Sequence, residues 1–238
     1  MFVSIAVLGL AATALAGSEY PEISSSKAYR LVVNVTSQSD FTPGVHGTEL
    51  GLVATGGAAA FRVVTVAPGT GSVFFSHPDA EIQPGETNAE WWRSTVTNNG
   101  GRILGLQAVD ADGRDLRFNM TAAAGGGDSG ATVKPEGPIY WANPTISGMF
   151  VEYIVCNATI EGGHHTVDAL AWSSRGPDYS LHLPDDCLRT KMFPQCDTIE
   201  NVAAGGLSDE VKAYLTAAEE IPCYKDVRGI DWNKYDDY

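Results

Sequence analysis

The chain has 238 residues, a formal net charge of −14 and a pI near 4.6. This acidity argues against nucleic acid as a partner, because a polyanion would be repelled, and it disfavours anionic membrane surfaces for the same reason. The length suits one large domain or two small ones, and we favour one main domain.

The first 16 residues, Met1 to Ala16, form an almost unbroken apolar stretch that ends in Ala14-Leu15-Ala16. Such a stretch is typical of a secretory signal peptide, with an uncleaved anchor as the alternative. It is shorter than the roughly 20 residues of a membrane-spanning helix, and no second apolar run of that length follows. The sequence therefore predicts a secreted, extracellular protein without a membrane span in the mature chain.

Residues 29–193 show two-residue alternation of apolar and polar side chains, and helical periodicity is nearly absent from them. Turn signals such as Pro68-Gly69 and Gly162-Gly163 separate the apolar runs. The pattern predicts an all-β fold, either a β-sandwich or an irregular barrel of about ten short strands. The expected strands are 28–36, 48–54, 60–67, 72–76, 102–109, 115–121, 149–156, 166–173, 179–183 and 188–193.

The small-residue stretch 122–130 is predicted to be a flexible surface loop. It contains Gly127-Asp128-Ser129-Gly130, the segment that surrounds the nucleophile of chymotrypsin-like proteases. A catalytic triad also needs a histidine base held by an acid, and none of the five histidines lies in the matching context. We therefore expect a loop here and assign no catalytic residue.

The character of the chain changes after Cys196. Ser208 can cap a helix over residues 208–220, and Asp209 and Glu210 suit its first turn. The acidic residues from Asp226 onward are expected to form a solvated tail. The expected organisation is a signal peptide (1–16), a β-rich extracellular domain (27–197) and a C-terminal extension (198–238). The apolar face expected for the helix consists of Leu207, Val211, Tyr214, Leu215 and Ala218.

Four cysteines, Cys156, Cys187, Cys196 and Cys223, predict disulfides in a secreted chain. Four cysteines allow three pairings. We prefer Cys187 with Cys196, which closes a short loop, and Cys156 with Cys223, and the other two pairings stay open. A zinc site is the alternative, but the chain has no Cys-x-x-Cys spacing.

Three Asn-x-Thr acceptors, at Asn34, Asn119 and Asn157, are candidate glycosylation sites. Asn34 and Asn119 alternate with apolar neighbours, so both are expected on the solvent face of a strand.

Two polar segments raise the question of metal binding. Residues 110–115 carry three aspartates at a spacing that calcium loops use, but Asp112-Gly113 is also a hairpin signal, which we favour. His164 and His165 are adjacent and point to opposite faces of an extended chain, so we expect a surface pair. We assign no metal site and no cofactor.

Trp91, Trp92 and Trp141 are candidate sugar contacts, because exposed aromatic rings on a β surface can stack on sugar rings. Trp172, in contrast, is expected in the core.

Several segments resemble a family of small secreted proteins of filamentous fungi that is built on a domain of unknown function. They are the block 27–36 with Asp40-Phe41-Thr42-Pro43, the strand end Val155-Cys156-Asn157, and the segments 183–187 and 193–196. The resemblance covers roughly Lys27 to Cys196 and implies a source and a compartment without an activity.

The leading hypothesis is therefore a secreted, N-glycosylated, non-enzymatic protein that works at a cell surface or in the extracellular medium. Its partner is unknown, and a carbohydrate and an extracellular protein are the two candidates. The alternative is a secreted carbohydrate-binding or carbohydrate-hydrolysing protein.

Overall fold

The computed structural model describes residues 20–55, 60–78, 93–110, 117–124, 131–136, 139–144, 150–160, 162–172, 183–204 and 206–235. Strands make up 56% of the structure, so the all-β prediction is confirmed. The strands are β1 (Ser24–Ser26), β2 (Ala28–Val35), β3 (Glu49–Ala54), β4 (Ala60–Val66), β5 (Phe74–Pro78), β6 (Arg93–Asn99), β7 (Arg102–Asp110), β8 (Arg117–Ala123), β9 (Ala131–Glu136), β10 (Ile139–Pro144), β11 (Phe150–Ile160), β12 (His164–Trp172), β13 (Cys187–Asp197) and β14 (Ile221–Cys223). The helices are α1 (Ile199–Ala203), α2 (Asp209–Ala217) and the 3-10 turn η2 (Trp232–Tyr235).

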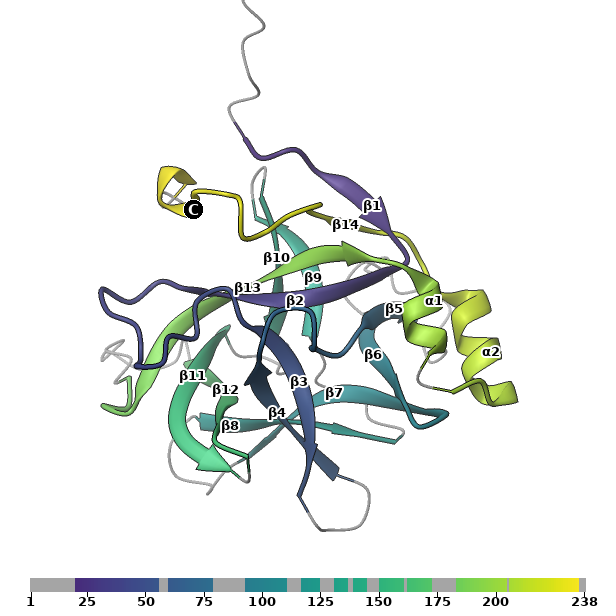
Figure 1. Ribbon diagram of the computed structural model, residues 1–238, viewed down its shortest axis with the longest axis horizontal. Helices are drawn as coiled ribbons and strands as arrows, with labels where there is room; N and C mark the ends of the chain where they lie inside the picture. Colours follow the sequence, from purple (N-terminus) through teal and green to yellow (C-terminus); the bar gives the residue numbers. More distant parts are fainter. Residues whose placement is uncertain are drawn as a thin grey trace, which may run out of the picture.

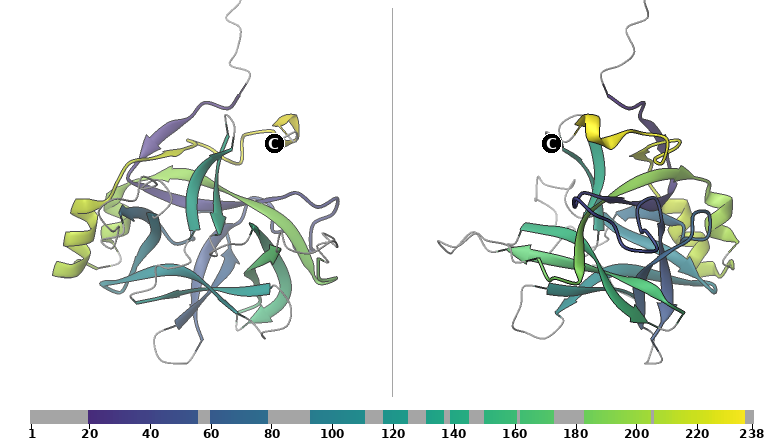
Figure 2. Two further views of the ribbon diagram at one scale, coloured as in Figure 1. Left: turned by 180° about the vertical axis from the view of Figure 1, so that it is seen from behind. Right: turned by 60° about the vertical axis from the view of Figure 1, so that its left-hand side comes forward.

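Antiparallel pairing closes the main sheet into a barrel of nine strands. Their order around the barrel is β2, β5, β6, β7, β8, β4, β12, β11 and β13 (Figures 1 and 2). The barrel closes where β13 pairs with β2, along a register that runs from Thr190 opposite Val35 to Asp197 opposite Ala28. Of the two architectures predicted from the sequence, the barrel is therefore correct.

The other edge of β2 is shared by two strands. Tyr29 pairs with Phe74 of β5, whereas Val32, three residues later, pairs with Glu49 of β3. Beyond these pairs β3 runs along β4, and β5 runs along β6 (Figure 1). A fork therefore opens at the edge of β2, with Arg30 between its two branches.

Side chains alternate between the two faces of each strand, and those that point inward fill the barrel interior. Tyr29, Leu31 and Val33 of β2 are at most 1% exposed and belong to one large apolar cluster. The burial of these inward-facing apolar side chains stabilises the folded barrel, because each Å² of apolar area removed from water contributes about 25 cal/mol. The other strands supply the buried residues Leu50, Val63, Phe74, Leu104, Leu106, Met120, Ala122, Ala142, Tyr153, Val155, Val167, Ala169, Leu188 and Met192.

The outer face of the barrel is also covered in two places. Phe75, Val96 and Ile103 pack under the helices α1 and α2. Val32 of β2 points outward, yet it is 1% exposed because the C-terminal segment 221–235 lies over it. This segment runs beside β1 and across β13 and β10 (Figures 1 and 2).

The prediction of a solvated tail is wrong for residues 226–235, the part of the tail that the structure describes. Val227 is 2% exposed, and Trp232 is 7% exposed. The Trp232 ring stacks on Phe193 of β13 with centroids 3.6 Å apart, and its Nε1 donates to the carbonyl of Val227 (3.1 Å). The acidic composition led to the prediction of a solvated tail, and the aspartates at 226 and 231 do face water. The aromatic Trp232, however, docks on the barrel.

The helix predicted over 208–220 is confirmed only in part. Ser208 caps α2 as expected, since its hydroxyl accepts from the Val211 amide (3.2 Å). The helix ends at Ala217 because Ala218 adopts an extended ψ of 132°, after which the Glu219 amide donates to Ser76 of β5. Of the predicted apolar face, Val211 and Ala218 are buried and Tyr214 and Leu215 pack partly against the barrel, whereas Leu207 is 55% exposed.

Some predicted boundaries are also wrong. Ala122 and Ala123, assigned to a flexible loop, continue β8, and Ala122 is fully buried because small side chains fit the crowded barrel interior. The strands β1, β6, β9, β10 and β14 had not been expected, since they are short or rich in polar residues and proline. Residues 125–130 and 179–182 lie outside the described residues.

We predict that Trp232→Ala lowers the free energy of unfolding by about 3 kcal/mol, because it removes a buried aromatic ring from the contact with Phe193. Urea unfolding of the purified protein measures this loss. Asn233→Ala, on the exposed side of the same turn, is the control and should change the free energy by less than about 0.5 kcal/mol. Equal effects of the two variants would contradict the docking of the C-terminal segment.

Candidate functional site

Glu49, the first residue of β3, is a buried carboxylate with an exposed fraction of 1%. Its oxygens accept hydrogen bonds from the backbone amides of Gly69 (2.9 Å) and Gly71 (3.0 Å). They also pair with Arg30 Nη1 (3.3 Å) and Arg228 Nη2 (2.5 Å). The carboxylate therefore joins β2, the loop before β5 and the C-terminal segment at one point.

Gly71 has no side chain where the chain passes this carboxylate. A Cβ atom at position 71 would lie 2.5 Å from Glu49 Cβ and 2.8 Å from the Leu50 carbonyl oxygen. Both distances are too short for a carbon atom, so the close approach that lets the Gly71 amide reach the carboxylate requires glycine.

The surroundings of Glu49 lower its pKa below the usual value of 4.5. Burial acts in the opposite direction, since it disfavours the charged form. The amide of Gly69, the Arg228 guanidinium, the amide of Gly71 and the charge of Arg30 together outweigh it. Glu49 is thus held as a carboxylate, and its charge contributes to the stability of the fold.

Arg30 extends the cluster to the end of β13. Its Nε donates to Asp197 Oδ2 (2.6 Å), and its Nη1 donates to the Gly71 carbonyl (2.5 Å) as well as to Glu49. Among the described residues, its third nitrogen, Nη2, has no partner. The two arginines and two acids of this cluster carry formal charges that sum to zero.

A pocket of about 240 Å³ lies at the fork in the sheet where Arg30 sits. β3 and the loop that precedes β5 form one wall, the end of β6 forms another, and α1 forms a third. The pocket is lined by Arg30, Leu52, Gly71, Ser72, Val73, Thr97, Asn98, Asn99, Asn201 and Val202. The pocket remains open because β3 and β5 diverge from the edge of β2, so their side chains do not fill the space between them.

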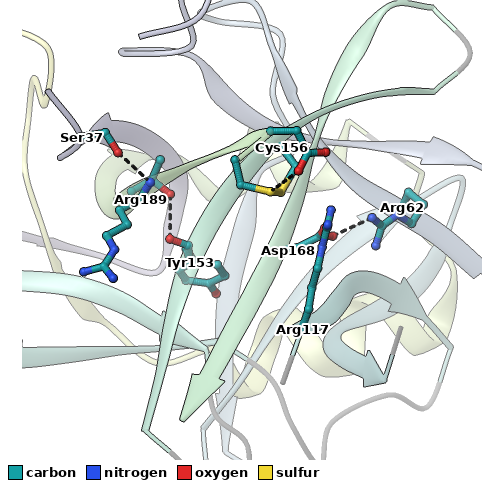
Figure 3. The surroundings of a disulfide bond; sticks show 10 residues. Ser37, Arg62, Arg117, Tyr153, Cys156, Asp168 and Arg189 are labelled. Atoms are coloured by element: carbon teal, nitrogen blue, oxygen red, sulfur yellow. Dashed lines mark hydrogen bonds and ion pairs between the residues drawn. A yellow bond between two sulfur atoms is a disulfide. The ribbon is translucent and has the colours of Figure 1, made fainter. Parts of the chain in front are cut away.

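A second buried carboxylate, Asp168 of β12, lies on the outer face of the barrel and is fully buried. It pairs with Arg62 of β4 (2.6 Å) and Arg117 of β8 (2.7 Å), as Figure 3 shows. β12 pairs with β4 for one residue and with β8 for three, so this triad reinforces short ladders. Its geometry ties three strands together with paired charges.

The four cysteines form two disulfides, and our preferred pairing is wrong. Cys156 bonds to Cys187 because β11 and β13 are neighbours and these residues stand opposite each other in the register (Figure 3). Cys196, at the end of β13, bonds to Cys223 of β14. The preference for the short loop failed because strand order, rather than sequence distance, brings cysteines together.

The predicted acceptor asparagines differ in exposure. Asn157 is exposed, beside the irregularity in the pairing of β11 with β12. Asn119 is half-buried on the outer face of β8. Asn34, expected to face solvent, is only 7% exposed. Alternation does place Asn34 on the outer face of β2, on the same side as Val32, but that face is buried at both positions.

The other residues singled out in the sequence do not gather into one site. Trp141 is 6% exposed, and Lys191 lies over its ring at 4.2 Å from the centroid, so it offers no open platform. His164 Nδ1 lies 3.1 Å from the Thr65 carbonyl oxygen, and the His165 ring stacks on Phe41 with centroids 4.8 Å apart. The two imidazoles thus have separate environments.

Other predictions fall partly or wholly on parts of the chain that the structure leaves undescribed. They are Trp91, Trp92, the Trp172 side chain, the segment Gly127-Asp128-Ser129-Gly130 and residues 111–115 of the calcium-loop candidate. Across the described ranges, no group of three or more His, Cys, Asp or Glu side chains could hold a metal ion. No helix in those ranges is long and apolar enough to cross a membrane.

Sequence reasoning missed the cluster of Glu49, Arg30, Asp197 and Arg228. The signals were a charged residue inside a predicted strand at Glu49 and a Gly-x-Gly loop at Gly69–Gly71. Neither reveals its partners, because Arg228 is 179 positions away along the chain.

The chain matches DUF7907, a domain of unknown function, over residues 26–196. The chain belongs to the DUF7907 family. The resemblance noted in the sequence, over roughly Lys27 to Cys196, is thereby confirmed. A relative of the chain is "Antigenic protein SchS34" of the filamentous fungus Stachybotrys chartarum, to which the chain is 29% identical over 227 residues. No solved structure gives a significant match.

The alignment with this relative covers 91% of the chain and 94% of the relative. Residues 1–196, which end where the DUF7907 match ends, make up less than 91% of the chain. The alignment therefore includes some of the residues that follow position 196.

We predict that Glu49→Gln lowers the free energy of unfolding by about 3–5 kcal/mol at neutral pH, since it leaves two arginines without their buried partner. The folded-state pKa of Glu49 is depressed, so its contribution is present above the usual value of 4.5 and is lost as the pH falls through the folded pKa. The difference between the two proteins should therefore shrink in acid. Urea unfolding between neutral pH and about pH 3 measures it.

Glu22→Gln is the matched control for this experiment. Glu22 pairs with Lys225 at the surface, where its side chain is 79% exposed, and its loss should have little effect at any pH. A constant difference between Glu49→Gln and the parent protein over the whole pH range would contradict the assignment of a buried carboxylate with a lowered pKa.

We also predict that the double variant Cys196→Ser/Cys223→Ser loses about 3–4 kcal/mol, given the 27-residue separation that this disulfide closes. In its background Trp232→Ala should cost less than in the parent protein, because the C-terminal segment would already be loosened. Cys156→Ser/Cys187→Ser is the control, since it leaves that segment attached. A cost of Trp232→Ala that is the same in all three backgrounds would contradict this coupling.

Proposed function

We propose that this DUF7907 protein is secreted and N-glycosylated and that it acts outside the cell or at the cell surface without catalysing a reaction. The observation that carries the proposal is the pair of disulfides that fix β13 to β11 and to β14. Structural disulfides persist in oxidising compartments and are rare in the cytosol. The apolar stretch 1–16 and a relative named as an antigenic protein agree with this compartment.

The exposure of the acceptor asparagines decides which glycans we propose. A glycan must project into solvent, which supports Asn157 first and Asn119 second. The burial of Asn34 opposes a glycan on the folded protein at that position. We therefore propose glycosylation at Asn157 and Asn119 and not at Asn34.

A non-catalytic role is supported by how the buried charges are used. Glu49 and Asp168 each contact two arginines, and Glu49 also accepts two backbone hydrogen bonds. Their charges join strands and segments that have few ladder hydrogen bonds between them. A general acid or base, in contrast, needs a carboxyl group that can exchange its proton near neutral pH, and the lowered pKa of Glu49 is unsuited to that task.

The alternative, a carbohydrate-active protein with a tryptophan platform, loses support at Trp141. That ring is buried against Phe193 and lies under Lys191. A platform would have to be built from Trp91 and Trp92, which lie outside the described residues.

We expect a chain expressed in a eukaryotic host to appear in the medium without its first 16 residues and with no free thiol. Treatment with an N-glycosidase should lower its mass, and Asn157→Gln and Asn119→Gln should each remove one glycan. Asn34→Gln is the matched control and should leave the glycan mass unchanged. Intact-mass spectrometry of the secreted protein and of each variant measures these changes in mass.

Three outcomes would contradict parts of this proposal. Retention inside the cell with reduced cysteines would contradict secretion, and a mass unaffected by the glycosidase would contradict N-glycosylation. Turnover of any substrate in a panel of protease, esterase and glycosidase substrates, at a rate lost in Glu49→Gln or Asp168→Asn while the fold is retained, would contradict a non-catalytic role.

A further inference from the structure

We propose that the pocket at the fork on the edge of β2, between β3 and the β5–β6 pair, is a binding site for a small, neutral, hydroxyl-rich ligand of the size of one sugar ring. This inference does not depend on secretion or on glycosylation, because it rests on the pocket alone. It also differs from the tryptophan platform considered above, since the pocket contains no tryptophan.

The size of the pocket limits the ligand. Its volume of about 240 Å³ is below the range of about 300–1,000 Å³ that is usual for sites of drug-sized molecules. One six-membered ring with its hydroxyl groups fits such a space, and an oligosaccharide would have to extend out of it. Asn99 and Asn201 line the pocket and are exposed, so it opens to solvent on their side.

The walls of the pocket are held by hydrogen bonds that leave them little freedom. Asn98 donates to the carbonyls of Val202 (2.8 Å) and Gly206 (2.7 Å) and accepts from the Gly101 amide (3.2 Å). Thr97 donates to the Val73 carbonyl (2.6 Å). These contacts fix β6 to α1 and to the loop before β5, so the site is preorganised before a ligand arrives.

Other polar groups of the pocket are free to bind. Arg30 Nη2 has donors without a partner among the described residues, while Nε and Nη1 hold the guanidinium in place. Asn201 uses only its Nδ2, toward Asp197, so its side-chain carbonyl can accept a hydroxyl proton. The side-chain amide of Asn99 and the hydroxyl of Ser72 have no hydrogen bond in the described structure. Residues with free donors and free acceptors thus line the same small pocket, as the binding of hydroxyl groups requires.

The charges around the pocket favour a neutral ligand. Arg30 already contacts Asp197 and Glu49, and Glu49 in turn contacts Arg228. An anion would meet a guanidinium whose charge is neutralised by two carboxylates, and a cation would gain nothing from carboxylates that are already paired. A ligand that offers only hydrogen bonds avoids both penalties.

The remaining lining is apolar and comes from Leu52, Val73 and Val202. Sugar rings present a C–H face besides their hydroxyl groups, and such a face can pack on aliphatic side chains. Asn201 and Val202 belong to α1, which follows residue 196, the end of the DUF7907 match. The site is therefore complete only in a chain that continues past residue 196 through α1.

The test is a titration of the full-length, disulfide-intact protein, enzymatically deglycosylated so that its own glycans do not compete. Protein-observed NMR or calorimetry would follow addition of D-glucose, D-mannose, D-galactose, N-acetylglucosamine or myo-inositol, with glucuronate and glucosamine as charged comparators. We expect saturable, weak binding of at least one neutral compound and weaker or no binding of its charged counterpart.

Asn99→Trp should block the mouth of the pocket and weaken this binding at least about tenfold, which corresponds to about 1.4 kcal/mol. Asn201→Ala, which removes an acceptor, should weaken it less. Asn233→Trp is the matched control, because it introduces the same side chain at an exposed position outside the pocket. All three variants should retain the thermal midpoint of the parent protein within a few degrees, which separates loss of binding from unfolding.

Three results would overturn the proposal. If no neutral compound binds saturably, or if Asn99→Trp binds like Asn233→Trp, the pocket is not the site. If glucuronate or glucosamine binds more tightly than the neutral sugars, the site exists but the ligand class is wrong. A protein that is not secreted or not glycosylated could still give the expected result, so the two proposals fail separately.

Discussion

The pairing of β13 with β2 is the interaction on which the rest of the structure depends. It joins a strand near the start of the described chain to one some 160 positions later, in a continuous register from Thr190 to Asp197, and without it the nine-stranded ring would not close. β13 also carries one cysteine of each disulfide and the ring of Phe193 on which Trp232 stacks. Because closure removes two sheet edges at once, this single ladder both completes the core and protects the sheet from pairing with other chains.

The way in which β2 pairs along its two edges explains the position of Glu49, of Arg30 and of the pocket. β2 gives one edge to β13 over its whole length and divides the other between β5 and β3. Only a few ladder hydrogen bonds attach β3 and β5 to β2. The ion pair between Arg30 and Glu49 therefore helps to hold β3 against β2. Arg228 approaches Glu49 from the C-terminal segment and makes the docking of that segment sensitive to the same carboxylate. Structural stability and the candidate binding site thus share one cluster of side chains.

The periodicity of the sequence was sufficient to predict what depends on local pattern. The inward set of β2, the all-β class and the cap at Ser208 follow from the spacing of apolar residues and from one side-chain hydrogen bond. Features that depend on strand order could not be predicted this way. Cys156 meets Cys187 because β11 pairs with β13 as well as with β12, and the pocket exists because β3 and β5 share an edge of β2. The prediction that residues from Asp226 onward are solvated was wrong because it used the overall acidic composition of this stretch. That composition does not show that Val227 and Trp232 supply an apolar side on which the segment docks.

The central claim is that the C-terminal segment is part of the same cooperative unit as the barrel. Native-state hydrogen exchange at two amides tests it most directly: Tyr224, which donates to the Pro194 carbonyl (2.9 Å), and Cys196, which donates to the Tyr224 carbonyl (2.8 Å). The account predicts that both amides exchange with the same free energy of opening as the amides of β2 and β13, close to that of global unfolding. Exchange of Tyr224 through a local opening of much lower free energy, while the β2–β13 ladder stays protected, would show that the segment is only an appendage.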